Sequence, residues 1–166
     1  MREVVRDRHR LEHILEAIKR ILDYSQGKTK EEIMADSLRF FGIVKNIEII
    51  GEASYKLTSA YKTNHMEVPW DAISKMRHVL VHDYYQIDSD QVWNVIHTEL
   101  MLLRTQIETQ IQNMDWEAWE KNENAIYESA VHKSLVQTAS RMKKDGLTIQ
   151  QISRYTGLTE EEIEDL

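Results

Sequence analysis

The chain has 166 residues, of which 42% are hydrophobic and 30% are charged, as expected for a globular protein with one compact domain and an appendage. It has no cysteine, which excludes a disulfide framework, a thiolate nucleophile and a zinc-finger-type site. No segment approaches the ~20 apolar residues that span a bilayer, and the first residues hold no apolar run of signal-peptide length. We therefore expect a cytoplasmic protein without a membrane partner.

Charge is unevenly distributed along the chain. The net charge is −7, which at first argues against a nucleic-acid partner. Residues 1–112 hold 15 Lys and Arg against 17 Asp and Glu, a net charge of −2, whereas residues 113–166 hold 6 against 11, a net charge of −5. The first part is nearly neutral, so a local basic surface on it could still bind a phosphodiester.

Apolar residues at three- and four-residue steps predict an all-α protein built from long helices. A first helix is expected at about residues 4–24, and Gly27 ends it. Thr29 and Glu32 have the spacing of a capping box and open a short helix. A longer helix follows, with its apolar stripe running over residues 43–60.

Glycine and proline mark further features of the first half. Gly42 and Gly51 lie inside the apolar pattern, where each costs ~1 kcal/mol relative to alanine, so we interpret them as sites of close packing. The residue before Pro69 is disfavoured in a helix, whereas Pro69 itself suits a first helical turn, so a new helix begins there. Asp88 is placed to cap another helix, which predicts a break between Val81 and Asp88.

The next helix is expected at residues 89–112. Four amphipathic helices with short connections predict an antiparallel four-helix bundle as the first domain, residues 1–112. Residues 113–166 form a C-terminal extension. Its polar start, up to residue 124, is interpreted as a connection, and a fifth helix is expected at residues 125–144.

Two very short helices are expected at the end of the chain, in an outline like a helix-turn-helix. Gly157 between them suits a left-handed C-cap. Their start signals are two capping-box pairs, Thr148 with Gln151 and Thr159 with Glu162.

The stretch RHVLVHDYY, residues 77–85, carries the residues that suggest chemistry. Cleaving RNA without a metal needs a base for the 2′-OH proton, an acid for the leaving 5′-oxygen and a cation for the charged phosphorane. His82 could serve in either proton transfer, and Arg77 offers a planar fork to two phosphate oxygens. If the helix ends near His82, an irregular connector or a two-fold dimer could bring the two side chains together.

Other interpretations of this stretch stay open. Arg and His at a helix C-terminus are favoured by the helix dipole alone, without any catalytic role. His78 and His82 have a metal-binding spacing, but no third ligand is obvious, so neither a metal nor another cofactor is predicted.

Four residues separate Arg77 from His82, and one residue separates His82 from Tyr84. This spacing resembles the RxxxxHxY signature of HEPN-domain toxins of the HepT type. The resemblance covers about residues 6–112. Other stretches agree with it in the same order, namely RLEHILEAIKRIL, KNIEIIGEASYKL, VPWDAISKMRHVLVHDYY and IDSDQVW.

This resemblance implies a four-helix HEPN bundle that forms a homodimer, with the motif lining a cleft at the two-fold interface. It implies a metal-independent endoribonuclease used as a toxin of a toxin–antitoxin pair, with Arg77 and His82 as the catalytic pair and RNA as substrate. Tyr84 matches the tyrosine that a cognate minimal nucleotidyltransferase antitoxin modifies with AMP. The alternative is a non-catalytic HEPN module that binds a nucleotide or docks a nucleotidyltransferase.

Three polar residues lie beside the apolar stripe of the KNIEIIGEA segment: Asn46, Glu48 and Glu52. Glu48 and Glu52 are one turn apart, so either could orient Arg77 by a charge-assisted hydrogen bond, while a solvated helix face is the plainer explanation. Arg2, Arg6 and Arg10 form a basic strip on the first helix, which is either a solvated face or a phosphate contact.

The C-terminal tail resembles that of recombination-promoting nucleases of the Rpn type and lies outside the usual HepT pattern. Its last seven residues hold five carboxylates, which argues against DNA as a partner and against a DNA-binding regulator. We expect the apolar residues of the tail to form a small face that docks on the bundle or on a second subunit. They are Ile149, Ile152, Leu158 and Ile163.

Overall fold

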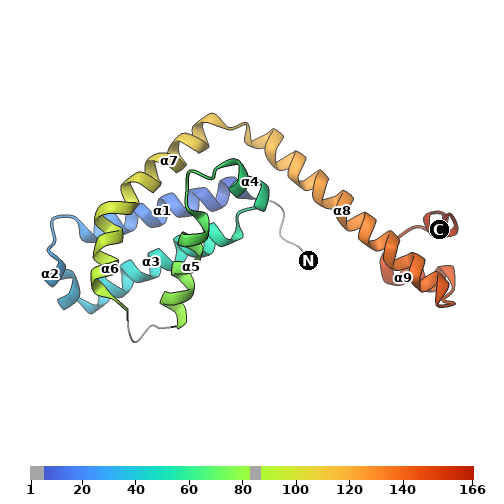
Figure 1. Ribbon diagram of the computed structural model, residues 1–166, viewed down its shortest axis with the longest axis horizontal. Coiled ribbons are helices and arrows are strands. Elements are labelled where there is room, and N and C mark those ends of the chain that lie inside the picture. Colours follow the sequence, from blue (N-terminus) through green and yellow to red (C-terminus); the bar gives the residue numbers. More distant parts are fainter. Residues whose placement is uncertain (1–5, 83–86) are drawn as a thin grey trace. The chain divides into compact units, whose positions relative to one another are not determined.

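The computed structural model describes residues 6–82 and 87–166; for residues 78–82 it describes the helix but not the side chains. All regular structure in these ranges is helical, which confirms the all-α prediction (Figure 1). The chain divides into two compact units, Met1–Trp116 and Glu117–Leu166. None of the described helices combines the length and the hydropathy that crossing a membrane requires.

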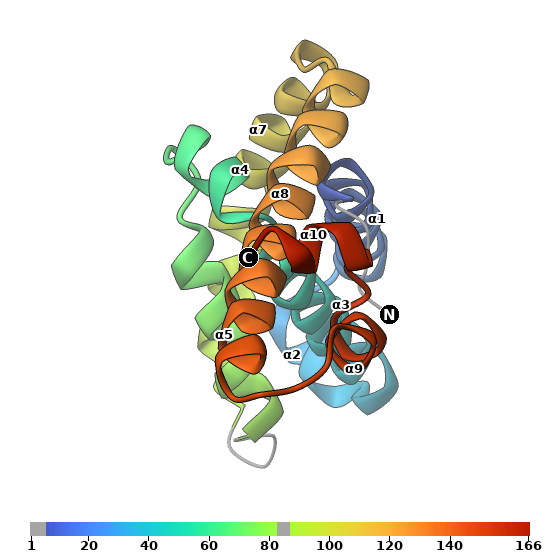
Figure 2. The same ribbon diagram turned by 90° about the vertical axis from the view of Figure 1, so that its right-hand side faces the viewer.

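The first unit is a bundle in which α1 packs against α3 and α7, and α3 packs against α5. Figure 1 shows α1 and α3 side by side, and in the turned view of Figure 2 α3 lies between α1 and α5. The helices of this unit are α1 (Asp7–Ser25), α2 (Lys30–Ala35), α3 (Ser37–Lys56), α4 (Ser59–Asn64), α5 (Trp70–His82), α6 (Ser89–Asn94), the π-helical segment η1 (Val95–Glu99) and α7 (Leu100–Asn113).

The apolar stripe predicted on the first helix forms the centre of this bundle. Its isoleucines and Leu11 are fully buried and meet the buried residues of α3 and α7. The fourth predicted helix exists, but it contains the π-helical segment at Val95–Glu99, which the apolar pattern does not reveal. The core residues are Leu11, Ile14, Ile18, Ile21, Ile43, Ile47, Ile50, Leu100, Leu103 and Ile107.

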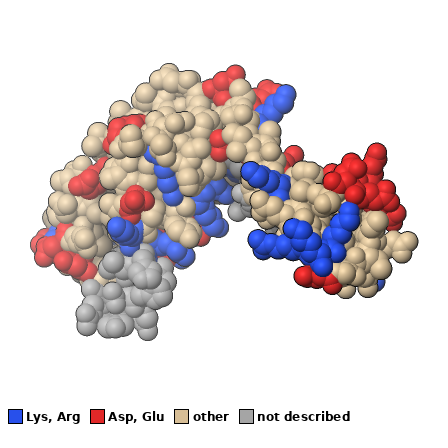
Figure 3. Space-filling view, turned by 45° about the vertical axis from the view of Figure 1, so that its right-hand side comes forward, with Lys and Arg blue, Asp and Glu red and all other residues tan. Residues whose placement is uncertain are grey.

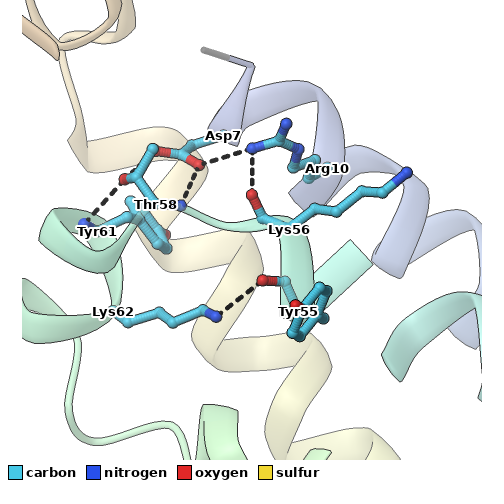
Figure 4. Close-up of polar contacts among 7 residues, drawn as sticks. All are labelled: Asp7, Arg10, Tyr55, Lys56, Thr58, Tyr61 and Lys62. Carbon is cyan, nitrogen blue, oxygen red and sulfur yellow. Dashed lines mark hydrogen bonds and ion pairs between the residues drawn. The ribbon is translucent and has the colours of Figure 1, made fainter. Parts of the chain in front are cut away.

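The prediction that the second long helix continues to residue 60 is wrong. This helix, α3, ends at Lys56, where a polar network terminates it (Figure 4). The buried Asp7 carboxylate accepts hydrogen bonds from the Thr58 backbone N–H at 2.9 Å and the Thr58 hydroxyl at 2.7 Å. The Thr58 hydroxyl in turn accepts from the backbone N–H of Tyr61 and caps α4. Arg10 pairs with Asp7 at 3.6 Å and donates to the Lys56 carbonyl at the end of α3.

The start of α6 is as predicted. One Asp88 carboxylate oxygen accepts from the backbone N–H groups of Asp90 at 2.8 Å and Gln91 at 3.2 Å. The helix before it, α5, is described as far as His82. The predicted break includes residues 83–86, which lie outside the described residues.

In the second unit, the fifth helix starts earlier than predicted. It is α8 (Trp116–Lys144), so residues 116–124 are helical and not a connection. Polarity alone does not break a helix, and this segment contains neither Gly nor Pro. Trp116, the first residue of α8, still belongs to the first unit; it is buried there and stacks on Tyr61, with ring centroids 5.9 Å apart.

The two short helices of the tail are α9 (Ile149–Thr156) and α10 (Glu160–Glu164), and both predicted capping boxes are present. Gly157 has a left-handed φ of 75°, as its predicted role requires. The prediction that the apolar face of the tail docks on the bundle or on a second subunit is wrong, because α9 and α10 pack against α8 within the same unit (Figure 2). The buried residues of this small core are Ala139, Ile152, Leu158 and Ile163.

Candidate active site

Arg77 lies on α5 at a point where this helix packs closely against α3. Gly51 of α3 faces it, and a Cβ atom at Gly51 would lie 2.5 Å from the Arg77 Cβ and 3.1 Å from the Ile73 carbonyl oxygen. Such distances are far inside van der Waals contact. Gly51 therefore permits the close packing that was predicted for it, and it fixes where the Arg77 backbone sits on α3.

The Arg77 guanidinium is held from one side by an ion pair. Its Nε atom lies 2.6 Å from Glu52 Oε2, and its Cζ atom lies 5.8 Å from the centroid of the Tyr55 ring. Glu52 also pairs with Lys56, at 3.3 Å. The Arg77 side chain remains 39% exposed, so it is positioned by α3 and still accessible to a solvent-borne anion.

The other two polar candidates on α3 have different partners. Glu48 pairs with Lys45 at 2.7 Å. Asn46 is buried, and its amide donates to the Gly42 carbonyl of the preceding turn at 2.7 Å. Of these three candidate polar residues, Glu52 is the one that the structure places on Arg77.

His82 is the last residue of α5, five positions after Arg77. Its side chain is not among those described, and Tyr84 lies outside the described residues altogether. The meeting of Arg77 with His82 and the role of Tyr84 therefore stay predictions from the sequence.

A groove of about 380 Å³ runs between α1 and α3, and Arg77 stands on its wall. Five Lys and Arg residues line it against two glutamates, although the whole chain has a net charge of −7. In Figure 3, several Lys and Arg side chains lie close together in the lower part of the first unit. The groove is lined by Arg6, His9, Arg10, His13, Lys45, Glu48, Ile49, Glu52, Ala53, Lys56 and Arg77.

The basic strip predicted on the first helix is only partly available to a ligand. Arg6 lines the groove and is exposed. Arg10 also lines it, but its side chain is 12% exposed and is engaged by Asp7 and the Lys56 carbonyl. Arg2 lies outside the described residues.

Four groove residues were missed by reasoning from the sequence: His9, His13, Lys45 and Lys56. The spacing of His9, Arg10 and His13 places them on one face of α1, with Arg6 at its N-cap, and could have signalled a polar face of the helix. The sequence gives no such sign that Lys45 and Lys56 lie opposite α1, because α3 and α1 come together only in the folded bundle.

Comparison with known protein families shows to which family the chain belongs. The family model described as "Ribonuclease HepT-like" matches residues 14–110, more than half of the sequence and nearly all of the bundle. This chain belongs to the HepT-like ribonuclease family. The matched part of the HepT-like chain contains Arg77, His82 and Glu52, whereas the groove residues Arg6 to His13 precede it.

Similar proteins occur in archaea and bacteria. A "probable ribonuclease HepT" of Thermococcus cleftensis is 32% identical over 98 residues, which are 59% of this chain and 89% of that protein. A "putative RNase" of Caldanaerobacter subterraneus subsp. tengcongensis is 31% identical over 102 residues, 61% of this chain and 91% of that protein.

A third relative is longer than the HepT-like chain. The "gamma-glutamylcyclotransferase and putative RNase" of Methanocaldococcus jannaschii is 28% identical over 150 residues, which are 90% of this chain but only 62% of that protein. An alignment of this length must continue past residue 110 into the second unit. No solved structure matches the chain.

Proposed function

We propose that this HepT-like chain is a metal-independent endoribonuclease. The observation that carries the proposal is the placement of Arg77: Glu52 holds it at 2.6 Å, and it stands on the wall of a groove in which cations outnumber carboxylates. A fixed, accessible guanidinium beside such a groove suits a polyanion whose phosphate must be bound in one orientation.

In the proposed reaction the RNA 2′-oxygen attacks the adjacent phosphorus, and the bond from phosphorus to the 5′-oxygen breaks. A base takes the 2′-OH proton and an acid protonates the leaving 5′-oxygen, giving a 2′,3′-cyclic phosphate and a 5′-hydroxyl. Arg77 stabilises the charge that develops on the non-bridging oxygens. His82 acts in proton transfer, for which imidazole is suited near neutral pH.

The finer parts of the proposal rest on the resemblance of the RxxxxHxY motif. The ribonuclease acts as a toxin and as a homodimer, and a cognate minimal nucleotidyltransferase antitoxin silences it by adding AMP to Tyr84. An adenylate beside Arg77 and His82 would bring bulk and negative charge to a site that must admit phosphate, so the modification would block the substrate.

Expression of the parent and of Arg77→Ala and His82→Ala chains in a bacterial host tests the proposal. Growth and the integrity of total RNA are scored, and intact mass of the purified protein detects added AMP. We expect the parent to arrest growth and degrade RNA, and both variants to do neither. Growth and RNA unaffected by the parent, with no AMP on the protein, would instead favour a non-catalytic module that docks a nucleotide or a nucleotidyltransferase.

A further inference from the structure

We propose that the groove between α1 and α3 is the channel along which a single RNA strand continues away from Arg77. Arg6, Lys45 and Lys56 bind its phosphates there, and the imidazoles of α1 contact its bases. This inference rests on the proposed function, since it assigns to Arg77 the scissile phosphate. It adds residues of α1 that lie before the matched family region.

The charge of the groove is the first argument. With five Lys and Arg and two Glu, it has a net charge of +3 before any histidine is counted, within a chain whose net charge is −7. Charges of one sign that line a cleft focus the electrostatic potential there and attract ligands of the opposite charge. Phosphodiesters are the anions that a ribonuclease must hold, and their binding to Lys and Arg dominates affinity for nucleic acids.

The availability of the cations is the second argument. Arg6 is exposed, and Lys45 keeps 69% of its side chain exposed although it pairs with Glu48. Lys56, paired with Glu52, is 48% exposed. Exposed ion pairs contribute only about 0–1 kcal/mol, so a phosphate can draw Lys56 from Glu52 at little cost. The Lys45 ammonium is exposed enough to contact a phosphate while its pair with the mostly buried Glu48 persists.

The length of the groove is the third argument. Lys45 and Lys56 are eleven residues apart on one helix, a separation of roughly 16 Å along α3 at 1.5 Å per residue. Arg77 contacts α3 between them, at Gly51 and Glu52. A cation therefore lies on each side of Arg77 along α3, so the groove can bind more than one phosphate of a strand whose scissile phosphate is at Arg77.

Two exposed histidines point to a single strand as the ligand. The rings of His9 and His13 lie 4.2 Å apart between centroids, inclined at 57°, and both line the groove. Imidazole rings can stack on bases, but only unpaired bases present a free face. A duplex would offer this surface its backbone alone.

Binding of a labelled 2′-O-methyl RNA oligonucleotide to the full-length protein tests the inference. This probe lacks the 2′-OH that the proposed reaction needs, so the measurement does not depend on cleavage. Fluorescence anisotropy over a range of salt concentrations gives the Kd and its salt dependence for the parent and for the double variant Arg6→Gln/Lys45→Gln. The matched control is Arg8→Gln/Lys19→Gln, which removes two charges from α1 outside the groove.

We expect the groove variant to bind roughly tenfold more weakly at low salt, with a slope of log K against log salt shallower by about 1.4, since two phosphate contacts are lost. The control should keep the parent's slope. The variant His9→Ala/His13→Ala should lose affinity for the single strand with a smaller change of slope. Equal Kd and slope for the groove variant and the control would overturn the inference.

The proposed function and this inference fail separately. Cleavage by the parent with unchanged binding by the groove variant would refute the channel and leave the ribonuclease. RNA binding that depends on the groove residues, without cleavage by the parent, would refute the ribonuclease and leave the channel. Equally tight binding of a matched duplex RNA would refute the single-strand assignment.

Discussion

Glu52 and Arg77 form an ion pair at 2.6 Å across the contact between α3 and α5. The pair is next to Gly51, whose missing side chain allows the two helices to meet. The same segment of α3 thus sets both the position of the Arg77 backbone and the direction of its guanidinium. We therefore regard Glu52 as a positioning residue that acts through Arg77.

Glu52→Gln tests this role. Loss of the carboxylate should leave the guanidinium free to adopt other rotamers, lowering kcat for RNA cleavage roughly tenfold, or about 1.4 kcal/mol, while KM changes less. Glu52→Asp keeps the charge and should recover part of the loss. The matched control is Glu108→Gln on α7, which also breaks a carboxylate–arginine pair, Arg104 to Glu108 at 2.8 Å, and should leave kcat unchanged. A Glu52→Gln enzyme with the parent's kcat would show that Arg77 needs no such support.

Gly51→Ala should separate α3 from α5. The new methyl group would lie 2.5 Å from the Arg77 Cβ, so we expect a loss of roughly 1–3 kcal/mol in the free energy of unfolding, measured with urea. Gly42→Ala is the control on the same helix, because its Cβ would meet only the Tyr24 ring, at 3.3 Å, and alanine favours a helix by ~1 kcal/mol. Equal stability of the two variants would mean that the helices do not meet at Gly51.

Asp7→Ala should destabilise the first unit strongly. The buried carboxylate accepts from the Thr58 N–H and hydroxyl and pairs with Arg10, so its removal leaves polar groups unpaired at the junction of α3 and α4. We expect a loss of about 3 kcal/mol in urea unfolding. In Asp23→Ala, which breaks an exposed pair with Lys19, the loss should stay below about 1 kcal/mol. Similar losses in both variants would contradict the structural role of Asp7.

Tyr61 should make the free energy of unfolding depend on pH in the alkaline range. Burial raises the pKa of its hydroxyl well above the usual 10.0, with the Asp7 and Glu67 charges adding to the effect, and the hydroxyl donates to Gln110 at 2.7 Å. The folded state therefore keeps a proton that the unfolded state releases above about pH 10. The stabilising contribution is complete below that pH and is lost progressively as pH rises from there towards the higher pKa of the folded state.

Tyr61→Phe isolates this effect. The difference in unfolding free energy between parent and variant, about 1 kcal/mol at neutral pH from the hydrogen bond, should shrink between pH 10 and 11. The exposed Tyr155→Phe serves as control and should show no such trend. A difference that stays constant over this range would mean that the Tyr61 hydroxyl ionises equally in both states.

Much of the fold could be predicted because its signals are local. The capping boxes at Thr29, Thr148 and Thr159 and the Asp88 cap are all present, since each depends on residues three positions apart. The end of α3 could not be predicted. It depends on Asp7, which lies 51 positions before Thr58 in sequence and meets it only after folding.

The candidate site likewise has a part that could be predicted from local sequence signals and a part that depends on tertiary contacts. Reasoning from the sequence found Arg77, and it found Glu52 as one of several carboxylates at helical spacing. The helical spacing alone does not decide whether Glu48 or Glu52 meets Arg77, because their distances from it depend on how α3 and α5 cross at Gly51. Reasoning from the sequence also missed Lys45 and Lys56, whose place in a groove requires α1 as the opposite wall.

The central claim is that Arg77 and His82 cleave RNA, and one measurement tests it directly. An end-labelled single-stranded RNA is incubated with purified parent, His82→Ala and Arg77→Ala chains in the presence of EDTA, and the products are resolved on a gel. The account predicts cleavage by the parent to fragments ending in a 2′,3′-cyclic phosphate, and rates at least about a hundredfold lower for both variants. A His82→Ala protein that cleaves as fast as the parent would contradict it.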